Sequence, residues 1–226
     1  MIISLHLPKT GGMSFAELLE RAFGDRLLRD YEDDAGYVVP ESQERARANA
    51  ARVRERRAEL QAKYDAIHGH FVADKYVGVF DASFVAFVRD PVQQAVSHYR
   101  FLQRSAHLTH PVVRVFHTSR PTLTEFVRWE ATQNPQSMFL GSLAVEDLAM
   151  VGLREEHARS VALFATTFGL ALGAEVFTNV DPVSHGRSHE VDPATRRAIE
   201  TAYARDVELY RRAREAFARQ VARRGA

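Results

Sequence analysis

A lysine, two hydroxyl groups and two adjacent glycines lie together near the start of the chain, in the segment Lys9-Thr10-Gly11-Gly12-Met13-Ser14. The lysine and the hydroxyls can bind an anion, and the glycines let the backbone approach it without a Cβ in the way. Where such a turn opens a helix, free N–H groups and the helix dipole favour a phosphate. The residue types therefore indicate a phosphate site. An ordinary turn, with Ser14 only capping the helix, remains the alternative.

A second anion-binding pair follows an apolar run at 84–88. Arg89 comes directly after this run, and Ser97 lies eight residues later on a predicted helix that Pro91 opens. A guanidinium supplies charge and a fork of donors to a phosphate, and a hydroxyl adds a hydrogen bond. Taken alone, this turn would be weak support for a phosphate site, since such turns occur in many proteins.

A histidine pair, His68 and His70, lies between these two turns. Imidazole titrates near neutral pH, so it can take the proton from a hydroxyl that acts as nucleophile. The pair is therefore a candidate for a general base, in which one ring could orient the other or contact the acceptor. A purely structural histidine beside a strand is the alternative.

These motifs together resemble those of the sulfotransferases. The Walker A loop places lysine after its glycines, whereas the run from Pro8 to Phe15 places Lys9 before them and resembles the sulfotransferase 5′-phosphosulfate loop. The segment from Arg89 to Tyr99 resembles the 3′-phosphate motif of the same family, but has Gln94 where an arginine is common. His68-Gly69-His70 resembles a segment of the glycan-type group, which includes heparan and dermatan 2-O-sulfotransferases and bacterial relatives.

The resemblance implies 3′-phosphoadenosine 5′-phosphosulfate as co-substrate, no metal, and a hydroxyl acceptor of the carbohydrate class. A lipid or a secondary metabolite stays open as acceptor. It assigns catalysis to His70 and Lys9, and an Asn134–Gln136 pair to a sugar or to adenine. It assigns the co-substrate to Lys9, Thr10, Gly11, Gly12, Met13, Ser14, Arg89, Ser97 and Arg187.

Elements that could position these residues alternate between strand and helix. Apolar runs predict strands at 1–5, 64–67, 84–88 and 176–178, and helical spacing predicts helices at 15–23, 41–63, 122–131, 154–168 and 192–221. This alternation indicates an α/β fold of three layers, with a central parallel sheet flanked by helices and the ligand at the carboxyl ends of the strands. The resemblance implies the P-loop-like sulfotransferase version of that fold, as a single domain over residues 1–226.

Composition argues against several other functional classes. The 226 residues carry 30 basic and 29 acidic side chains, a balance that does not suggest nucleic-acid binding. There is no cysteine, and the pair His107 and His110 has no carboxylate nearby in sequence, so no metal site is expected. No secretory signal or membrane span is expected either, which leads to the expectation of a cytoplasmic, bacterial protein.

Two rival functions stay open. A kinase-like phosphotransferase would require ATP and Mg²⁺, and the missing Walker A loop speaks against it. A nucleotide-binding protein without catalytic activity would keep the same fold, and Gln94 keeps that hypothesis alive. The oligomeric state is also left open.

Overall fold

The computed structural model describes residues 1–33, 40–171 and 188–225. Five parallel strands form one sheet in the order β2-β3-β1-β4-β5. They are β1 (Ile2–Leu5), β2 (Leu27–Asp30), β3 (Ala66–Gly69), β4 (Ser83–Val88) and β5 (Met150–Leu153). The predicted α/β class with a central parallel sheet is therefore confirmed.

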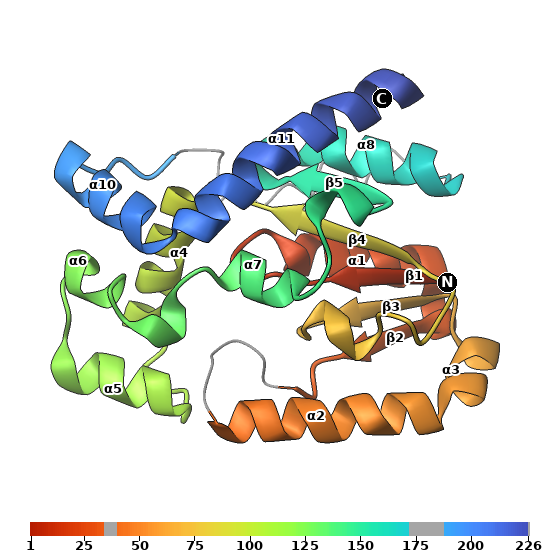
Figure 1. Cartoon of the computed structure of the whole chain (residues 1–226), viewed down its shortest axis with the longest axis horizontal. Coiled ribbons are helices and arrows are strands. Elements are labelled where there is room, and N and C mark those ends of the chain that lie inside the picture. Colours follow the sequence, from red (N-terminus) through yellow and green to blue (C-terminus); the bar gives the residue numbers. More distant parts are fainter. Residues whose placement is uncertain (34–39, 172–187, 226) are drawn as a thin grey trace.

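Ten α-helices surround the sheet in the described part of the chain: α1 (Gly12–Phe23), α2 (Pro40–Glu55), α3 (Arg57–Lys63), α4 (Pro91–Arg104), α5 (Pro111–Ser119), α6 (Leu123–Phe126), α7 (Pro135–Leu140), α8 (His157–Phe168), α10 (Pro193–Ala202) and α11 (Ala204–Arg224). Short 3-10 turns include η2 (Ala73–Lys75), η4 (Val145–Asp147) and η5 (Arg154–Glu156). All strand arrows in Figure 1 point toward α4 and α7, so this end of the sheet holds the predicted motifs.

Helices cover both faces of the sheet, as a three-layer fold requires. On one face, the ring of Phe15 in α1 lies 4.6 Å from Phe87 of β4 and 4.9 Å from Phe164 of α8. On the other face, α7 and α11 lie in front of the strands in Figure 1. The connection from β1 to β2 runs toward one edge of the sheet, and the connection from β3 to β4 runs toward the other edge. Right-handed crossovers therefore place these connecting segments on opposite faces of the sheet.

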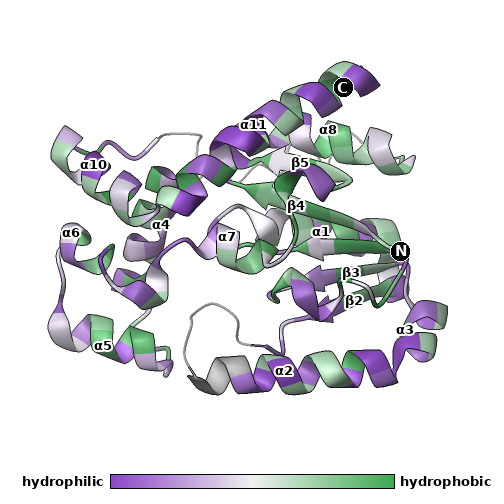
Figure 2. Ribbon diagram, viewed as in Figure 1, coloured by the Kyte–Doolittle hydropathy of each residue, from purple (hydrophilic) through white to green (hydrophobic). Residues whose placement is uncertain are grey.

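The core has two parts. The larger part consists of the strands and the helix faces that pack on them, which are green in Figure 2, whereas α2 is largely hydrophilic. A second apolar cluster joins α4, α5, α6 and α10 through Val96, Phe116, Phe126 and Ile199. Trp129 packs edge-on against Phe126, with the ring centroids 5.6 Å apart.

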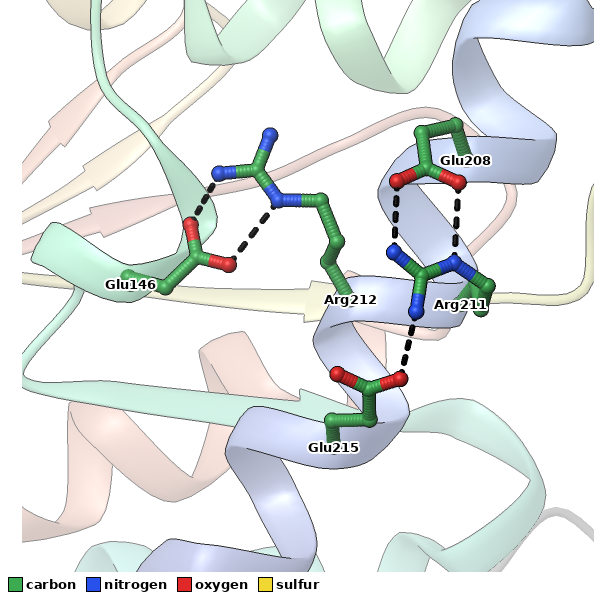
Figure 3. A network of polar contacts seen from close by, with 5 residues as sticks. All are labelled: Glu146, Glu208, Arg211, Arg212 and Glu215. Carbon is green, nitrogen blue, oxygen red and sulfur yellow. Dashed lines mark hydrogen bonds and ion pairs between the residues drawn. The ribbon is translucent and has the colours of Figure 1, made fainter.

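Charged side chains hold α11 across the sheet edge (Figure 3). Arg212 makes a two-pronged ion pair with Glu146 of η4, and Arg211 pairs with Glu208 and Glu215 on its own helix. These groups are largely exposed, so each pair adds little to stability. The Arg212–Glu146 pair joins α11 to the segment that leads into β5.

Several predicted boundaries differ from the structure. The helix predicted at 41–63 is divided at Arg56, and the one at 192–221 is divided at Tyr203. The helix at 122–131 is reduced to α6 and a 3-10 turn, and the strand predicted at 64–67 lies two residues later, at Ala66–Gly69. Strands β2 and β5 were not predicted, and the strand predicted at 176–178 lies outside the described residues.

Candidate active site

The turn after β1 opens a helix, as predicted. Gly11, with φ of 93°, is the N-cap of α1, which starts at Gly12 and has neither a side-chain cap nor an acidic residue in its first turn. Ser14 is therefore the third residue of the helix, and the alternative that it caps the helix is wrong. The N–H groups of this first turn have no partner within the helix, so they suit an anion.

Both glycines of the turn are required by their neighbours. A Cβ at Gly12 would lie 2.0 Å from Cδ2 of His6, and a Cβ at Gly11 would lie 2.6 Å from Cδ of Arg154. Gly11 also adopts a left-handed φ that side chains disfavour. The turn is therefore packed between an imidazole and an arginine side chain.

The remaining turn residues have distinct environments. The Thr10 hydroxyl is buried and donates to the Leu7 carbonyl at 2.9 Å, so its proton is used within the turn. Met13 is 61% exposed and can offer a ligand only its backbone and a loose side chain. Ser14 is half-buried. In this conformation, a ligand would meet the Thr10 backbone rather than its hydroxyl proton.

The two predicted phosphate motifs meet in space. Arg89 Nη1 donates to the carbonyl of Lys9 at 3.0 Å, across a separation of 80 residues. Gln94 Nε2 donates to the carbonyl of Pro8 at 3.2 Å, and the Gln94 side chain is fully buried. Gln94 stands where an arginine is common in the 3′-phosphate motif of the sulfotransferases. Here it holds the backbone that leads into the Lys9 turn.

Gln136 holds the other motif in place. Its Oε1 accepts from the Arg89 N–H at 2.8 Å, and its Nε2 donates to the Arg89 carbonyl at 2.9 Å. The Asp206 carboxylate accepts from the Gln136 N–H at 3.0 Å, and Asn134 Oδ1 accepts from the Asp206 N–H at 3.1 Å. The expectation that Asn134 and Gln136 contact a sugar or adenine is therefore wrong, because both side chains bond to the backbone.

Four cations gather around the Lys9 turn. Burial, then Arg104, then Arg89 lower the pKa of Lys9 to about 8. Burial also lowers the pKa of Arg89, and Arg154 adds to this effect while Glu155 opposes it. Lys9 Nζ lies 4.3 Å from the Phe101 ring centroid. Mutual destabilisation of cations is what a bound anion relieves.

Arg154 is a site residue that the sequence did not reveal. It follows β5 directly and lies against Gly11. Because β5 was not recognised as a strand, nothing in the sequence placed Arg154 at the carboxyl end of the sheet. A prediction of β5 from its apolar residues Met150 to Leu153 would have given the signal.

Three histidines stack at the carboxyl ends of β1 and β3. The His6 and His70 rings lie 4.1 Å apart with planes 19° from parallel, and the His6 and His68 rings lie 5.3 Å apart at 20°. His68 Nδ1 lies 2.9 Å from the Ser4 hydroxyl. The predicted pair, His68 and His70, is thus held by His6, which the sequence did not single out.

Burial keeps all three rings neutral. Burial and the neighbouring His70 and His68 lower the pKa of His6 to about 2, and burial lowers the pKa of His68 to about 3. Burial also lowers the pKa of His70 to about 4. His70 Nδ1 is buried without a hydrogen-bond partner among the described residues. A neutral ring is what a general base needs.

Tyr31, which follows β2, is a further residue beside this stack. Its hydroxyl lies 2.9 Å from Nδ1 of His6, and its ring packs edge-on against His70 at 5.3 Å. The acidic, irregular segment in which Tyr31 lies gave no sign of this role. Only the position of β2 beside β3 brings Tyr31 to the histidines.

The other predicted site residues are less defined. Ser97 is half-buried on α4, and Arg187 lies outside the described residues. Near that boundary, Gln93 of α4 holds the His189 backbone, accepting from its N–H at 2.5 Å and donating to its carbonyl at 3.1 Å. Residue 189 is therefore fixed beside the Arg89 end of α4.

The described residues contain no group of three or more histidine, cysteine, aspartate or glutamate side chains that could hold a metal ion. Among the same residues, none of the helices combines the length and the apolar character needed to cross a bilayer.

Comparison with known proteins gives a distant structural likeness. No family model matches the chain, and no curated protein matches it. Among solved structures, the chain is similar to mouse sulfotransferase SULT7A1 complexed with PAP, with 12% sequence identity and a TM-score of 0.48. This likeness covers 95% of the present chain and 87% of the mouse chain.

Proposed function

We propose that this protein is a sulfotransferase that moves a sulfuryl group from 3′-phosphoadenosine 5′-phosphosulfate to an acceptor hydroxyl. The observation that carries the proposal is the hydrogen bond from Arg89 to the Lys9 carbonyl, which joins the 5′-phosphosulfate and 3′-phosphate motifs at one end of the sheet. Ligands of open parallel sheets bind at this end. The two motifs thus lie where one ligand with two phosphates could contact both.

The cations around the turn suit such a ligand. The first-turn N–H groups of α1 and the Lys9 ammonium would hold the 5′-phosphate, with Lys9 at the oxygen that bridges phosphorus and sulfur. Arg89 would hold the 3′-phosphate, together with Ser97 and Arg187. Lowered pKa values at Lys9 and Arg89 support this assignment, since a bound phosphate would offset the burial and the neighbouring cations that lower them.

The histidine stack suits the acceptor side. As the acceptor oxygen forms its bond to sulfur, the bond from sulfur to the bridging oxygen breaks, and the hydroxyl proton passes to the His70 ring. The bisphosphate leaves with the bonding electrons, and Lys9 stabilises the charge on its oxygen. The resemblance of His68-Gly69-His70 to the glycan-type group favours a carbohydrate hydroxyl as acceptor.

Calorimetric titration tests the co-substrate site. We expect 3′-phosphoadenosine 5′-phosphate to bind in preference to ATP with Mg²⁺. Arg89→Ala should weaken this binding by about 10- to 100-fold, the effect of losing a charged hydrogen-bond donor. Arg114→Ala, on the exposed side of α5, is the matched control and should bind like the parent.

Sulfuryl transfer to a panel of hydroxyl acceptors tests the catalytic assignment. His70→Ala should lose transfer and keep bisphosphate binding, whereas His107→Ala, at an exposed position, should keep both. Bisphosphate binding without transfer to any acceptor would favour the non-catalytic alternative. A preference for ATP with Mg²⁺ would overturn the proposal in favour of a phosphotransferase.

A further inference from the structure

The hydrogen bond between Tyr31 and His6 defines which nitrogen of His6 carries its proton. The Tyr31 oxygen lies 2.9 Å from Nδ1 of His6. The Arg29 guanidinium carbon lies 5.5 Å from the Tyr31 ring centroid, and Arg29 interacts with the Tyr31 hydroxyl. An arginine can only donate, so the Tyr31 proton is left to point at Nδ1. The neutral His6 ring then carries its proton on Nε2.

Nε2 of His6 faces the phosphate turn. A Cβ at Gly12 would lie only 2.3 Å from this nitrogen, so Nε2 is packed directly against the first residue of α1. Nε2 makes no hydrogen bond with any residue that the structure describes. A donor without a partner is thus aimed at the turn in which the 5′-phosphosulfate is proposed to bind.

The histidine stack prevents the ring from turning away. His70 lies 4.1 Å from His6 on one side, and the edge of Tyr31 packs on His6 at a centroid distance of 5.8 Å and an angle of 88°. His6 itself is 6% exposed. Rotation of the ring would break the Tyr31 hydrogen bond and the stack together, so the donor direction is preset.

We propose that the Nε2–H of His6 donates a hydrogen bond to the sulfuryl group during transfer, and that Tyr31 is a positioning residue that fixes this tautomer. The inference rests on the proposed sulfotransferase function and deepens it. A neutral donor preset at this place orients the sulfuryl oxygens for in-line attack and does not repel the adjacent Lys9. Lys9 stabilises the negative charge that shifts to the bridging oxygen as its bond to sulfur breaks.

Nitrogen-15 NMR of the full-length protein tests the tautomer without turnover. Two-bond correlations distinguish Nε2–H from Nδ1–H in a neutral imidazole, and the spectrum of His6→Gln assigns the His6 signals. We expect the Nε2–H form in the parent and a mixture of tautomers in Tyr31→Phe, which keeps the ring and loses the hydroxyl. A parent spectrum with Nδ1–H, or no change in Tyr31→Phe, would overturn the role of Tyr31.

The same spectrum tests the contact with the sulfuryl group. Addition of 3′-phosphoadenosine 5′-phosphosulfate should shift the His6 Nε2–H resonance more than the 3′,5′-bisphosphate does. Equal shifts with both ligands would overturn the proposed contact. Binding of neither ligand would instead overturn the proposed function, while the tautomer result would stand.

Steady-state kinetics distinguish a hydrogen-bond donor role of His6 from a packing role. His6→Leu should lower kcat by about 100-fold, the effect of losing one preset donor, with a much smaller change in KM for the co-substrate. His6→Gln, whose amide nitrogen can reach the place of Nε2, should recover about 10-fold of this loss. Equal kcat values for His6→Gln and His6→Leu, with both variants folded, would overturn donation and leave only packing.

Discussion

Gln136 encloses the backbone of Arg89 with two hydrogen bonds, at 2.8 Å to the N–H and 2.9 Å to the carbonyl. The two residues lie on different elements, the end of β4 and the start of α7. Asp206 of α11 in turn fixes α7 by accepting from the N–H groups of Gln136 and Ser137. The position of the Arg89 side chain therefore depends on a chain of polar contacts that reaches the last helix.

Replacing Gln136 with methionine tests this dependence. Met fills a similar volume but leaves the Arg89 N–H and carbonyl without partners, so we expect a loss of about 2 kcal/mol in the free energy of unfolding. Bisphosphate affinity should fall as well, because Arg89 is no longer held toward Lys9. Urea unfolding and calorimetry measure the two effects. Gln103→Met, at an exposed position of α4, is the control. Unchanged stability in Gln136→Met would contradict the structural role.

Local patterns made part of this site predictable. The strand before Lys9 and the helix after Gly12 leave clear apolar periodicity, so the turn between them was predicted from neighbouring residues alone. Arg89 and Pro91 were placed at the end of a strand for the same reason. In both cases, the signal lies within about ten residues of the site.

The histidine stack and Arg154 depend on contacts between distant strands. Pairing of Leu5 with Gly69 in parallel register sets His6 beside His70, but the sequence does not state that β1 and β3 are neighbours. Strand β2 lies at the edge of the sheet and mixes apolar with charged residues, and β5 has only four residues. Neither strand was recognised, because β2 has no unbroken apolar run and the short run of β5 directly precedes the predicted helix at 154–168, so Tyr31 and Arg154 were missed.

The pH dependence of the reaction follows from Lys9 and His70. The ammonium of Lys9 must be charged to hold a phosphate, and its pKa is about 8. His70 must be neutral to accept a proton, and its pKa is about 4. We therefore expect kcat/KM for the co-substrate to rise as the pH increases through about 4, to level off, and to fall above about 8.

Lys9→Arg tests whether loss of the Lys9 charge causes the decrease at alkaline pH. Arginine stays charged throughout this range, so bisphosphate affinity in this variant should no longer fall above pH 8. In the parent, the bound anion stabilises the Lys9 ammonium, so kcat should begin to decrease at a higher pH than kcat/KM does. A parent whose bisphosphate affinity is constant up to pH 10 would refute the assignment of Lys9.

Restoring the arginine of the resembling motif at position 94 should impair the protein. Gln94 is fully buried and donates to Pro8 from beneath the turn. A guanidinium there would be desolvated beside Lys9 and Arg89, so we expect a loss of about 3 kcal/mol in stability and weaker bisphosphate binding. Thermal unfolding and calorimetry provide the measurement, with Gln103→Arg as the exposed control on the same helix. Tighter binding by Gln94→Arg would show that the anion reaches this position.

A buried ion network supports the strand end next to Tyr31. Lys75 Nζ lies 2.6 Å from Asp30 and 2.7 Å from Asp33, and these three side chains are at most 6% exposed. The hydroxyl of Tyr76 donates to Asp30, and the amide of Asn49 donates to Asp33, both at 2.7 Å. Lys75→Met leaves two buried carboxylates without a cation, so we expect a loss of about 3–5 kcal/mol in the free energy of unfolding.

The loss in Lys75→Met should depend on pH in a defined direction. Burial already raises the pKa of Asp33, and removal of the lysine raises it further. A carboxyl whose folded pKa lies above its unfolded value stabilises the fold below the unfolded pKa, and that stability is lost as the pH rises through the folded pKa. The deficit relative to the parent should therefore be largest near neutral pH and shrink toward pH 5.

Urea unfolding at several pH values measures this deficit, with the exposed Lys63→Met as control. Adding Asp33→Asn should restore part of the loss, because one buried charge is then removed together with its partner. A deficit that is independent of pH, or unrelieved by Asp33→Asn, would mean that packing rather than charge holds this strand end.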